Sequence, residues 1–305
     1  MAATGGWSWS ARGLFLLVAL VWGFNFLFVK SGLDFTNGLW LAFLRAGSGS
    51  LAVAAILTGL RGWGTLDARG RRDALLIGLP NTAAFFALFM WATSYVLPGY
   101  ASVLVVTFPL WVAVLSVPVL HHRLGRLHWV SVAVAFVGVG LFSEVWAGGG
   151  SNSPIAILEL LGAAVAWAIG TVLFQRRFRP EEALEANAYQ LFGGTGALLV
   201  ATLVLAPYPL PVATPGLIES VLFLGVLGTA MAYPIWFHLL VRTRAATLSA
   251  YVFLVPLIAL LASAVFYHER LAPVQIVGVA LVLASIYGVG RAQAPLTLPP
   301  SASAT

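Results

Sequence analysis

Two tryptophans, each with a polar residue one helical turn away, are the first side chains in this sequence that could form a binding site. Asn25 follows Trp22 by three residues and Thr171 follows Trp167 by four, so on a helix each pair shares a face. Tryptophan gathers at membrane interfaces, whereas both of these lie in the middle of long apolar runs. An amide at that depth needs water or a partner, which favours a position facing a cavity. Two interpretations stay open: aromatic walls around an amphipathic ligand, or ordinary helix packing.

Prolines accompany most of the other candidate binding residues. A proline removes one backbone donor and tends to kink its helix, and a kinked helix can line a cavity and absorb motion. Pro109 and Pro256 occupy corresponding places in two similar stretches of sequence, so we predict that both act as hinges. Prolines are common in membrane helices in any case, so a purely structural role is the alternative. The residues assigned to the predicted cavity are Trp22, Asn25, Asn81, Phe85, Thr107, Phe108, Trp167, Thr171, Tyr233, Trp236 and Tyr251.

Ionisable side chains within the apolar runs are few, and each is costly to bury. Insertion scales put an arginine or aspartate at a helix centre at about 2.5–3.5 kcal/mol. Arg45, Glu159 and Glu219 lie nearer the ends of their predicted helices, from which their side chains could reach the interface. The functional alternative is an Arg45–Glu159 charge pair, or Glu159 as a group that couples transport to protons.

The residues needed for several kinds of chemistry are missing from this sequence. It contains no cysteine, no Walker-type glycine-rich loop and no His-Glu-x-x-His motif, and Lys30 is its only lysine. His121, His122 and His128 do not share the i, i+4 spacing of a helical metal site. We therefore predict no catalytic residue, no metal site and no cofactor, and an intramembrane enzyme is a remote alternative.

The composition requires lipid rather than water around most of the chain. Of the 305 residues, 60% are hydrophobic and 9% are charged, and the mean hydropathy is +0.95. A soluble domain carries about 25% charged residues. The basic residues form no continuous face, so nucleic acid is not an expected partner, whereas the bilayer and a small-molecule substrate are. Hydropathy and breakers predict ten all-α spans, at residues 13–33, 38–60, 73–96, 99–121, 127–146, 154–175, 186–206, 215–241, 247–267 and 272–290.

The distribution of lysine and arginine predicts the orientation of these spans. With the N-terminus inside, thirteen basic residues fall in cytoplasmic segments, and only Lys30 and Arg270 fall outside. Both termini are therefore expected in the cytoplasm. The tail over residues 291–305 is rich in Pro, Ala and Ser, and we expect it to be disordered.

The two halves of the sequence repeat one another. An offset of 147 maps Pro109 onto Pro256, and an offset of 145 maps Trp22 onto Trp167. Five spans per half is an odd number, so the second repeat, 154–290, must be inverted relative to the first, 12–146. Such inverted repeats place a substrate site near the membrane midplane between the halves. The fifth and tenth spans carry small residues that allow close packing, and we expect them to join the halves.

The motifs at these positions resemble a known family. Trp22-Gly23-Phe24-Asn25-Phe26, Lys30 and Phe43-Leu44-Arg45 look like the opening of the drug/metabolite transporter superfamily, in its EamA-type branch. His268-Glu269-Arg270-Leu271 is similar to the close of an EamA repeat, whereas His121-His122-Arg123 departs from it by lacking the acidic residue. The resemblance covers about residues 12–290. It implies a ten-helix, multi-pass protein of the bacterial inner membrane with a central cavity, similar to aromatic-lined amino-acid exporters.

Sequence and resemblance together lead to one functional expectation. We expect a secondary transporter that exports amino acids or similar small metabolites by alternating access, with a monomer being compatible with the sequence. The alternative is export of drug-like or other organic metabolites. An exporter of cations would need a buried acid in the cavity, and a nucleotide-sugar carrier would need deep basic residues, to which only Arg45 comes near. An aromatic and amide-lined cavity suits zwitterions and small amphipathic solutes.

Overall fold

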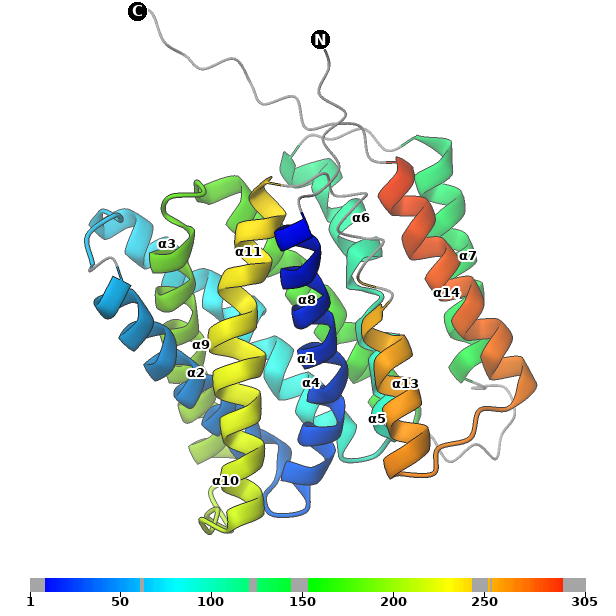
Figure 1. The fold of residues 1–305 in the computed structure, drawn as a ribbon, viewed down its shortest axis with the longest axis horizontal. Helices are drawn as coiled ribbons and strands as arrows, with labels where there is room; N and C mark the ends of the chain where they lie inside the picture. The colour runs from blue at the N-terminus through cyan, green and yellow to red at the C-terminus, as the bar shows by residue number, and fades with distance from the viewer. Residues whose placement is uncertain are drawn as a thin grey trace, which may run out of the picture.

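A computed structural model describes residues 9–60, 63–120, 125–143, 153–242, 252 and 254–292, and this part of the chain is helical, without strands (Figure 1). The all-α prediction is thereby confirmed. Among the described residues, eight helices are long and apolar enough to cross a membrane, and two shorter apolar helices, Leu254–Phe266 and Pro273–Gly288, follow. The eight lie at Gly13–Leu33, Gly38–Leu60, Ala68–Thr93, Pro98–Leu120, Arg126–Ser143, Pro154–Arg177, Ala183–Leu205 and Pro215–Phe237.

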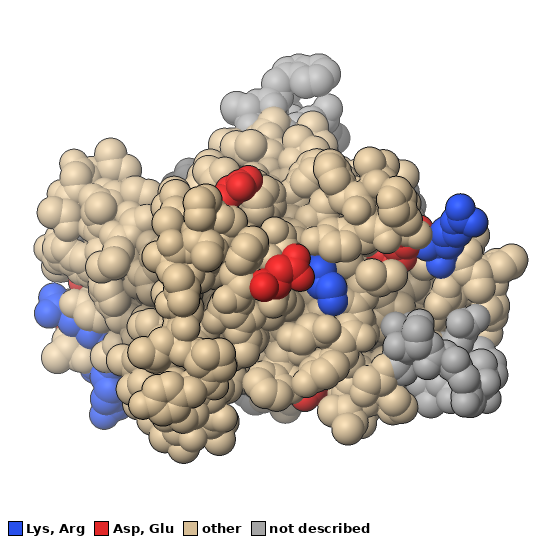
Figure 2. Space-filling model, turned by 90° about the horizontal axis from the view of Figure 1, so that it is seen from below, with Lys and Arg blue, Asp and Glu red and all other residues tan. Residues whose placement is uncertain are grey.

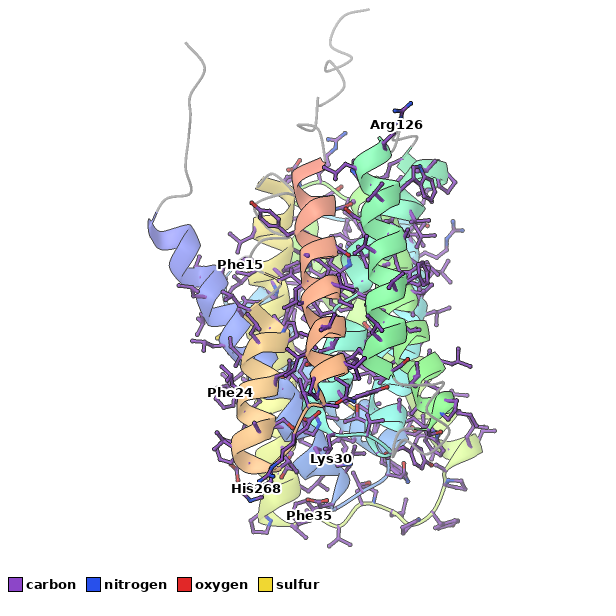
Figure 3. All side chains as sticks on the ribbon, turned by 90° about the vertical axis from the view of Figure 1, so that its right-hand side faces the viewer. Phe15, Phe24, Lys30, Phe35, Arg126 and His268 are labelled. Carbon is purple, nitrogen blue, oxygen red and sulfur yellow. The ribbon has the colours of Figure 1, made fainter. Side chains whose placement is uncertain are left out.

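Four of the described helices run through the main bundle without interruption. They are α1 (Trp9–Leu33), α2 (Gly38–Leu60), α8 (Pro154–Arg177) and α9 (Ala183–Leu205). We call the end at which α1 begins and α14 (Pro273–Ala292) ends the proximal end, and the opposite end the distal end. Lys30 and His268 lie at the distal end, and Arg126 lies at the proximal end (Figure 3). Figure 2 views the distal end, where charged side chains are few.

Three other spans change their helical geometry partway. A π-helical segment, η1 (Leu79–Ala84), separates α3 (Ala68–Gly78) from α4 (Phe85–Thr93), and another, η3 (Phe223–Met231), separates α10 (Pro215–Leu222) from α11 (Ala232–Arg242). A turn at residues 106–107 separates α5 (Pro98–Val105) from α6 (Phe108–Leu120). Each irregularity lies at or just before a proline, Pro80, Pro109 or Pro234, because the ring cannot donate and crowds the preceding turn.

Glycines allow both π-helical segments to lie directly against neighbouring helices. A side chain at Gly49 of α2 would collide with Thr229 of η3, and one at Gly194 of α9 would collide with Thr82 of η1. The two contacts correspond under the sequence offsets, because Gly49 maps onto Gly194 by 145 and Thr82 onto Thr229 by 147. The first half of the sequence therefore supplies the glycine of one contact and the threonine of the other, and the second half supplies their equivalents.

One helix pair stands beside the rest of the bundle. Helix α7 (Arg126–Ser143) packs along α14, at the right of Figure 1. A Cβ built on Gly138 would lie 2.9 Å from the carbonyl oxygen of Gly278, so the two backbones are in contact there. Small residues at such a contact let membrane helices approach closely. This arrangement agrees with the joining role expected of these spans.

Candidate functional site

The centre of the bundle contains a cavity of about 60 Å³. Its lining comes from α1, α2, α4, α5, α6, α8, α11 and α13 (Leu254–Phe266), which belong to both halves of the sequence. The lining residues are Trp22, Asn25, Phe26, Arg45, Phe85, Phe89, Val105, Val106, Phe108, Trp167, Tyr233 and Val255. Ligand sites in proteins are commonly lined by apolar and aromatic side chains with a few polar groups, and the lining of this cavity has that composition.

Aromatic rings form most of the cavity wall. The rings of Trp22 and Trp167 meet edge to face with their centroids 6.2 Å apart, and Tyr233 lies 5.0 Å from Trp167. Phe85 and Phe108 contact the same indole at 4.8 and 6.1 Å. The two tryptophans, which are 145 residues apart in the sequence, therefore share one wall. The structure thus places these two predicted cavity residues in contact.

The polar groups of α1 lie against η3. The Nε1 atom of Trp22 donates to the carbonyl oxygen of Gly228 at 3.2 Å, which fixes the ring in place. A side chain at Gly228 would collide with the carboxamide of Asn25. Asn25 is 5% exposed, and its Oδ1 atom is buried without a hydrogen-bond partner in the described part of the chain. An unpartnered amide oxygen beside an apolar cavity can accept a hydrogen bond from a ligand.

Arg45 lines the cavity, and its position corrects two expectations. The side chain is 2% exposed, so it does not reach the interface. Its Nε atom donates to the hydroxyl of Thr229 at 3.1 Å, and the guanidinium lies 4.2 Å from the ring centroid of Phe86. The ion pairs among the described residues do not include Arg45 or Glu159. The predicted pair does not form, since α2 packs mainly against α9, η3 and α4, whereas α8 lies against α4, α6 and η1.

Other predicted residues lie behind the lining or away from it. Trp236 packs on Trp22 at 5.1 Å and supports the wall from behind. Asn81 donates to Gln190 at 2.8 Å within a buried amide network. Thr171 is 1% exposed, and its hydroxyl has no partner. Thr107 donates to the carbonyl oxygen of Leu104 and borders a separate apolar cleft between α6, α7 and α8. Tyr251 lies outside the described residues.

The two predicted hinge residues lie in α6 and α13. Pro109 is the second residue of α6, immediately after the turn at residues 106–107. Pro256 lies in α13, and Val252 just before that helix is helical as well. Both are buried.

Several lining residues were not predicted from the sequence, although the spacing of two of them could have identified them. Phe26 follows Trp22 by four residues, and Phe89 follows Phe85 by four. This spacing places each phenylalanine on the face of a residue already assigned to the cavity. Val105, Val106 and Val255 are ordinary apolar residues in apolar helices, so nothing in the sequence distinguishes them from lipid-facing ones.

Side chains tie helix ends together below the cavity, at the distal end. Lys30 of α1 donates to the carbonyl oxygens of Thr93, Ser94 and Val96, at 3.2, 3.3 and 3.2 Å. These groups belong to the end of α4 and the turn after it, where helical carbonyls lack partners within the helix and favour a cation. The lysine therefore joins α1 to α4.

A carboxylate makes the corresponding link between α13 and α5. Glu269 accepts from the backbone N–H of Gly99 at 3.0 Å and from the hydroxyl of Ser263. Burial raises the pKa of the Glu269 carboxyl above its usual value, although these hydrogen bonds act in the opposite direction. The hydroxyl of Tyr267 adds a 3.5 Å contact to the carbonyl oxygen of Leu27. Together with Lys30, these contacts hold the distal end closed around α1.

The chain is similar in sequence to known transporters. The EamA-like transporter family matches residues 9–143 and 154–291. An uncharacterized transporter of Bacillus subtilis is 28% identical over 274 residues, covering 90% of this chain and 89% of its own length. A probable amino-acid metabolite efflux pump of Salmonella typhimurium is 29% identical (90% and 92% covered). A probable terminal-alkyne amino-acid exporter of Streptantibioticus cattleyicolor is 28% identical (90% and 92%).

A solved structure gives a further comparison, of the fold alone. A crystal structure with no functional description superposes with a TM-score of 0.66 at 18% sequence identity. The match covers 92% of this chain and 96% of that one. The arrangement of helices described above is therefore shared with a protein whose structure has been solved.

Proposed function

The chain belongs to the EamA-like transporter family, and on that premise we propose that it exports amino acids or similar small metabolites by alternating access. It is a multi-pass transporter of the inner membrane. Relatives described as probable amino-acid metabolite efflux pumps align over most of its length, which supports both the substrate class and the direction.

The main support for this proposal is the central cavity. Residues from both halves of the chain surround it, and the tryptophan of each half contributes to the same wall. A site shared between two halves can open to either side of the membrane as the halves tilt against each other. No acidic residue is among those that line this cavity in the described part of the chain. That favours zwitterions or anions over the organic cations that many drug exporters carry.

The proposed architecture is ten transmembrane helices in two inverted repeats, 12–146 and 154–290, with both termini and the tail 291–305 in the cytoplasm. The matched contacts of Gly49 with Thr229 and of Gly194 with Thr82 support the repeat. A second matched pair supports it as well: Asn25 meets Gly228, and Gly170, which corresponds to Asn25, meets Asn81, which corresponds to Gly228.

In the proposed cycle, Pro109 and Pro256 mark the places where helices bend. The turn between α5 and α6 lies beside lining residues Val106 and Phe108, so a change of angle there would reshape the cavity wall. The contacts of Lys30 and Glu269 would break when the distal end opens. We assign the distal end to the periplasmic side, because it carries few basic residues.

Counterflow in proteoliposomes tests the proposal. Purified protein is reconstituted with unlabelled amino acid inside, and uptake of each of a panel of labelled amino acids is followed. We expect saturable, protein-dependent exchange for at least one amino acid with a large apolar side chain. A second panel of labelled organic cations is measured in proteoliposomes that contain the matching unlabelled cation, and uptake confined to this panel would favour the drug-export alternative. Absence of any saturable flux from folded protein would contradict transport of this class.

A further inference from the structure

The guanidinium of Arg45 has more hydrogen-bonding capacity than the protein uses. An arginine carries five N–H donors and stays charged in proteins. Among the hydrogen bonds of the described residues, Arg45 makes one, from Nε to Thr229. Its Nη1 atom is buried and has no hydrogen-bond partner among the described residues. A buried donor without a partner costs free energy, and more when it is charged, so this atom on the cavity wall is available to bind a ligand.

The corresponding residue in the second half of the chain provides a contrast. An offset of 145 maps Arg45 onto Gln190. Gln190 accepts from Asn81 at 2.8 Å and donates to Asn187 at 2.7 Å, so protein groups occupy both ends of its amide. Arg45, at the same place in its own half, donates from Nε to Thr229, but its Nη1 atom has no partner among the described residues. The two equivalent positions therefore hold a neutral amide whose ends are both bonded and a cation with a donor to spare.

The surroundings of Arg45 specify what the ligand must supply. The cation faces an aromatic cavity whose described lining contains no carboxylate. A carboxylate matches the planar donor face of a guanidinium and can accept two parallel N–H groups. Asn25 and Arg45 both line this cavity, and they meet successive residues of η3, Gly228 and Thr229.

We infer that Arg45 binds the carboxylate of the transported molecule and so determines substrate specificity. The ligands are monocarboxylates with an aromatic or large apolar group, which packs against Trp22, Trp167 and Phe85. In α-amino acids, the ammonium group would donate to Asn25. The inference rests on the proposed transport function and narrows its substrate class: a carboxylate is required, whereas an amino group is not.

Three probes of similar shape test the inference in the wild-type protein. They are phenylalanine, 3-phenylpropionate, which lacks the amino group, and phenylalaninamide, which lacks the carboxylate. Binding to detergent-purified full-length protein is measured by titration calorimetry. We expect both carboxylates to bind and the amide to bind at least tenfold more weakly. Equal binding of the amide and phenylalanine, or no binding of either carboxylate, would overturn the inference without any variant.

Variants then assign the preference to Arg45. Arg45→Gln reproduces the residue of the second half, and we expect it to lose about 10- to 100-fold in affinity for both carboxylates. Arg45→Lys keeps the charge and should retain part of the preference. Arg126→Gln, at an exposed arginine of α7, is the matched control and should bind as the wild type does. A carboxylate preference that survives in folded Arg45→Gln would overturn the role of Arg45.

Measuring binding and flux on the same purified protein tests the ligand assignment and the transport function separately. Arg45-dependent carboxylate binding without any flux in proteoliposomes would contradict transport and leave the ligand assignment standing. Saturable flux of solutes that have no carboxylate would support transport and overturn the ligand assignment.

Discussion

At the scale of single residues, Trp22 shows how one side chain can both build the cavity and hold it in place. Its ring forms part of the wall, while its Nε1 atom binds the carbonyl oxygen of Gly228 on η3. Trp167 contributes a ring to the same wall, but its Nε1 atom is buried and has no hydrogen-bond partner among the residues that the structure describes. The two tryptophans, equivalent in sequence, therefore differ in what they offer: Trp167 keeps a free donor.

Replacing Trp167 with alanine should weaken substrate binding without unfolding the protein. The indole is 3% exposed, and the contact area lost to a ligand is worth about 1.5–3 kcal/mol, or roughly 10- to 150-fold in affinity. Calorimetry with phenylalanine measures the change. Trp129→Ala on α7 is the control, since that tryptophan is 53% exposed and lies outside the cavity lining. Equal binding by both variants would show that Trp167 only packs.

The sequence could identify individual cavity residues only where helical spacing linked them to an unusual neighbour. Trp22 with Asn25 and Trp167 stood out because tryptophan and amides are rare in the middle of apolar helices. The environment of Arg45 was not predictable in that way. Whether an arginine on α2 reaches lipid headgroups, Glu159 or Thr229 depends on which helices lie next to α2, and these contacts join residues 184 positions apart in the chain.

At the scale of helices, the turn before Pro109 is the site at which we expect bending. Pro109 cannot donate a hydrogen bond to the carbonyl of Val105, and α5 ends at that residue. Pro109→Ala restores the donor and should make the span straighter and stiffer. We expect turnover in proteoliposomes to fall severalfold while the binding affinity for phenylalanine changes little. Loss of affinity with unchanged turnover would instead indicate a role in binding.

Glu269 gives the link between α13 and α5 a dependence on pH. Its pKa in the folded protein is above the usual value of 4.5, because burial disfavours the charged form. The folded state then binds more protons than the unfolded state just above pH 4.5, so this contribution to stability is complete below that pH and is lost as the pH rises through the folded pKa. The melting temperature of the wild type relative to Glu269→Gln should therefore decrease as the pH is raised from 4 to 8. A constant difference would contradict the assignment.

Helix positions were easier to predict from the sequence than helix irregularities. The predicted spans 13–33 and 38–60 coincide with Gly13–Leu33 and Gly38–Leu60, because hydropathy is a local property. The prolines indicated that the helices near residues 80, 109 and 234 would deviate. They could not indicate π-helical turns in η1 and η3, since those depend on the close contacts with α9 and α2.

At the scale of the whole molecule, orientation can be tested because the chain contains no cysteine. Val212 is 71% exposed in the segment between α9 and α10 at the distal end, and Arg69 is exposed in the first turn of α3 at the proximal end. In intact cells, Val212→Cys should react with a membrane-impermeant maleimide added to the periplasmic side, and Arg69→Cys should react only after the membrane is opened. The reverse pattern would invert the proposed topology.

Because of its contacts, the reactivity of the Lys30 amine should report whether the distal end is open. This residue is the chain's only lysine, so an amine-directed acylating reagent has two targets, its ε-amine and the N-terminal amine. While three carbonyl oxygens hold the ε-amine, it is poorly available for acylation. Opening the distal end would release it. The ratio of acylation at the two amines, read by mass spectrometry of intact protein, should therefore follow the conformational cycle without any engineered label.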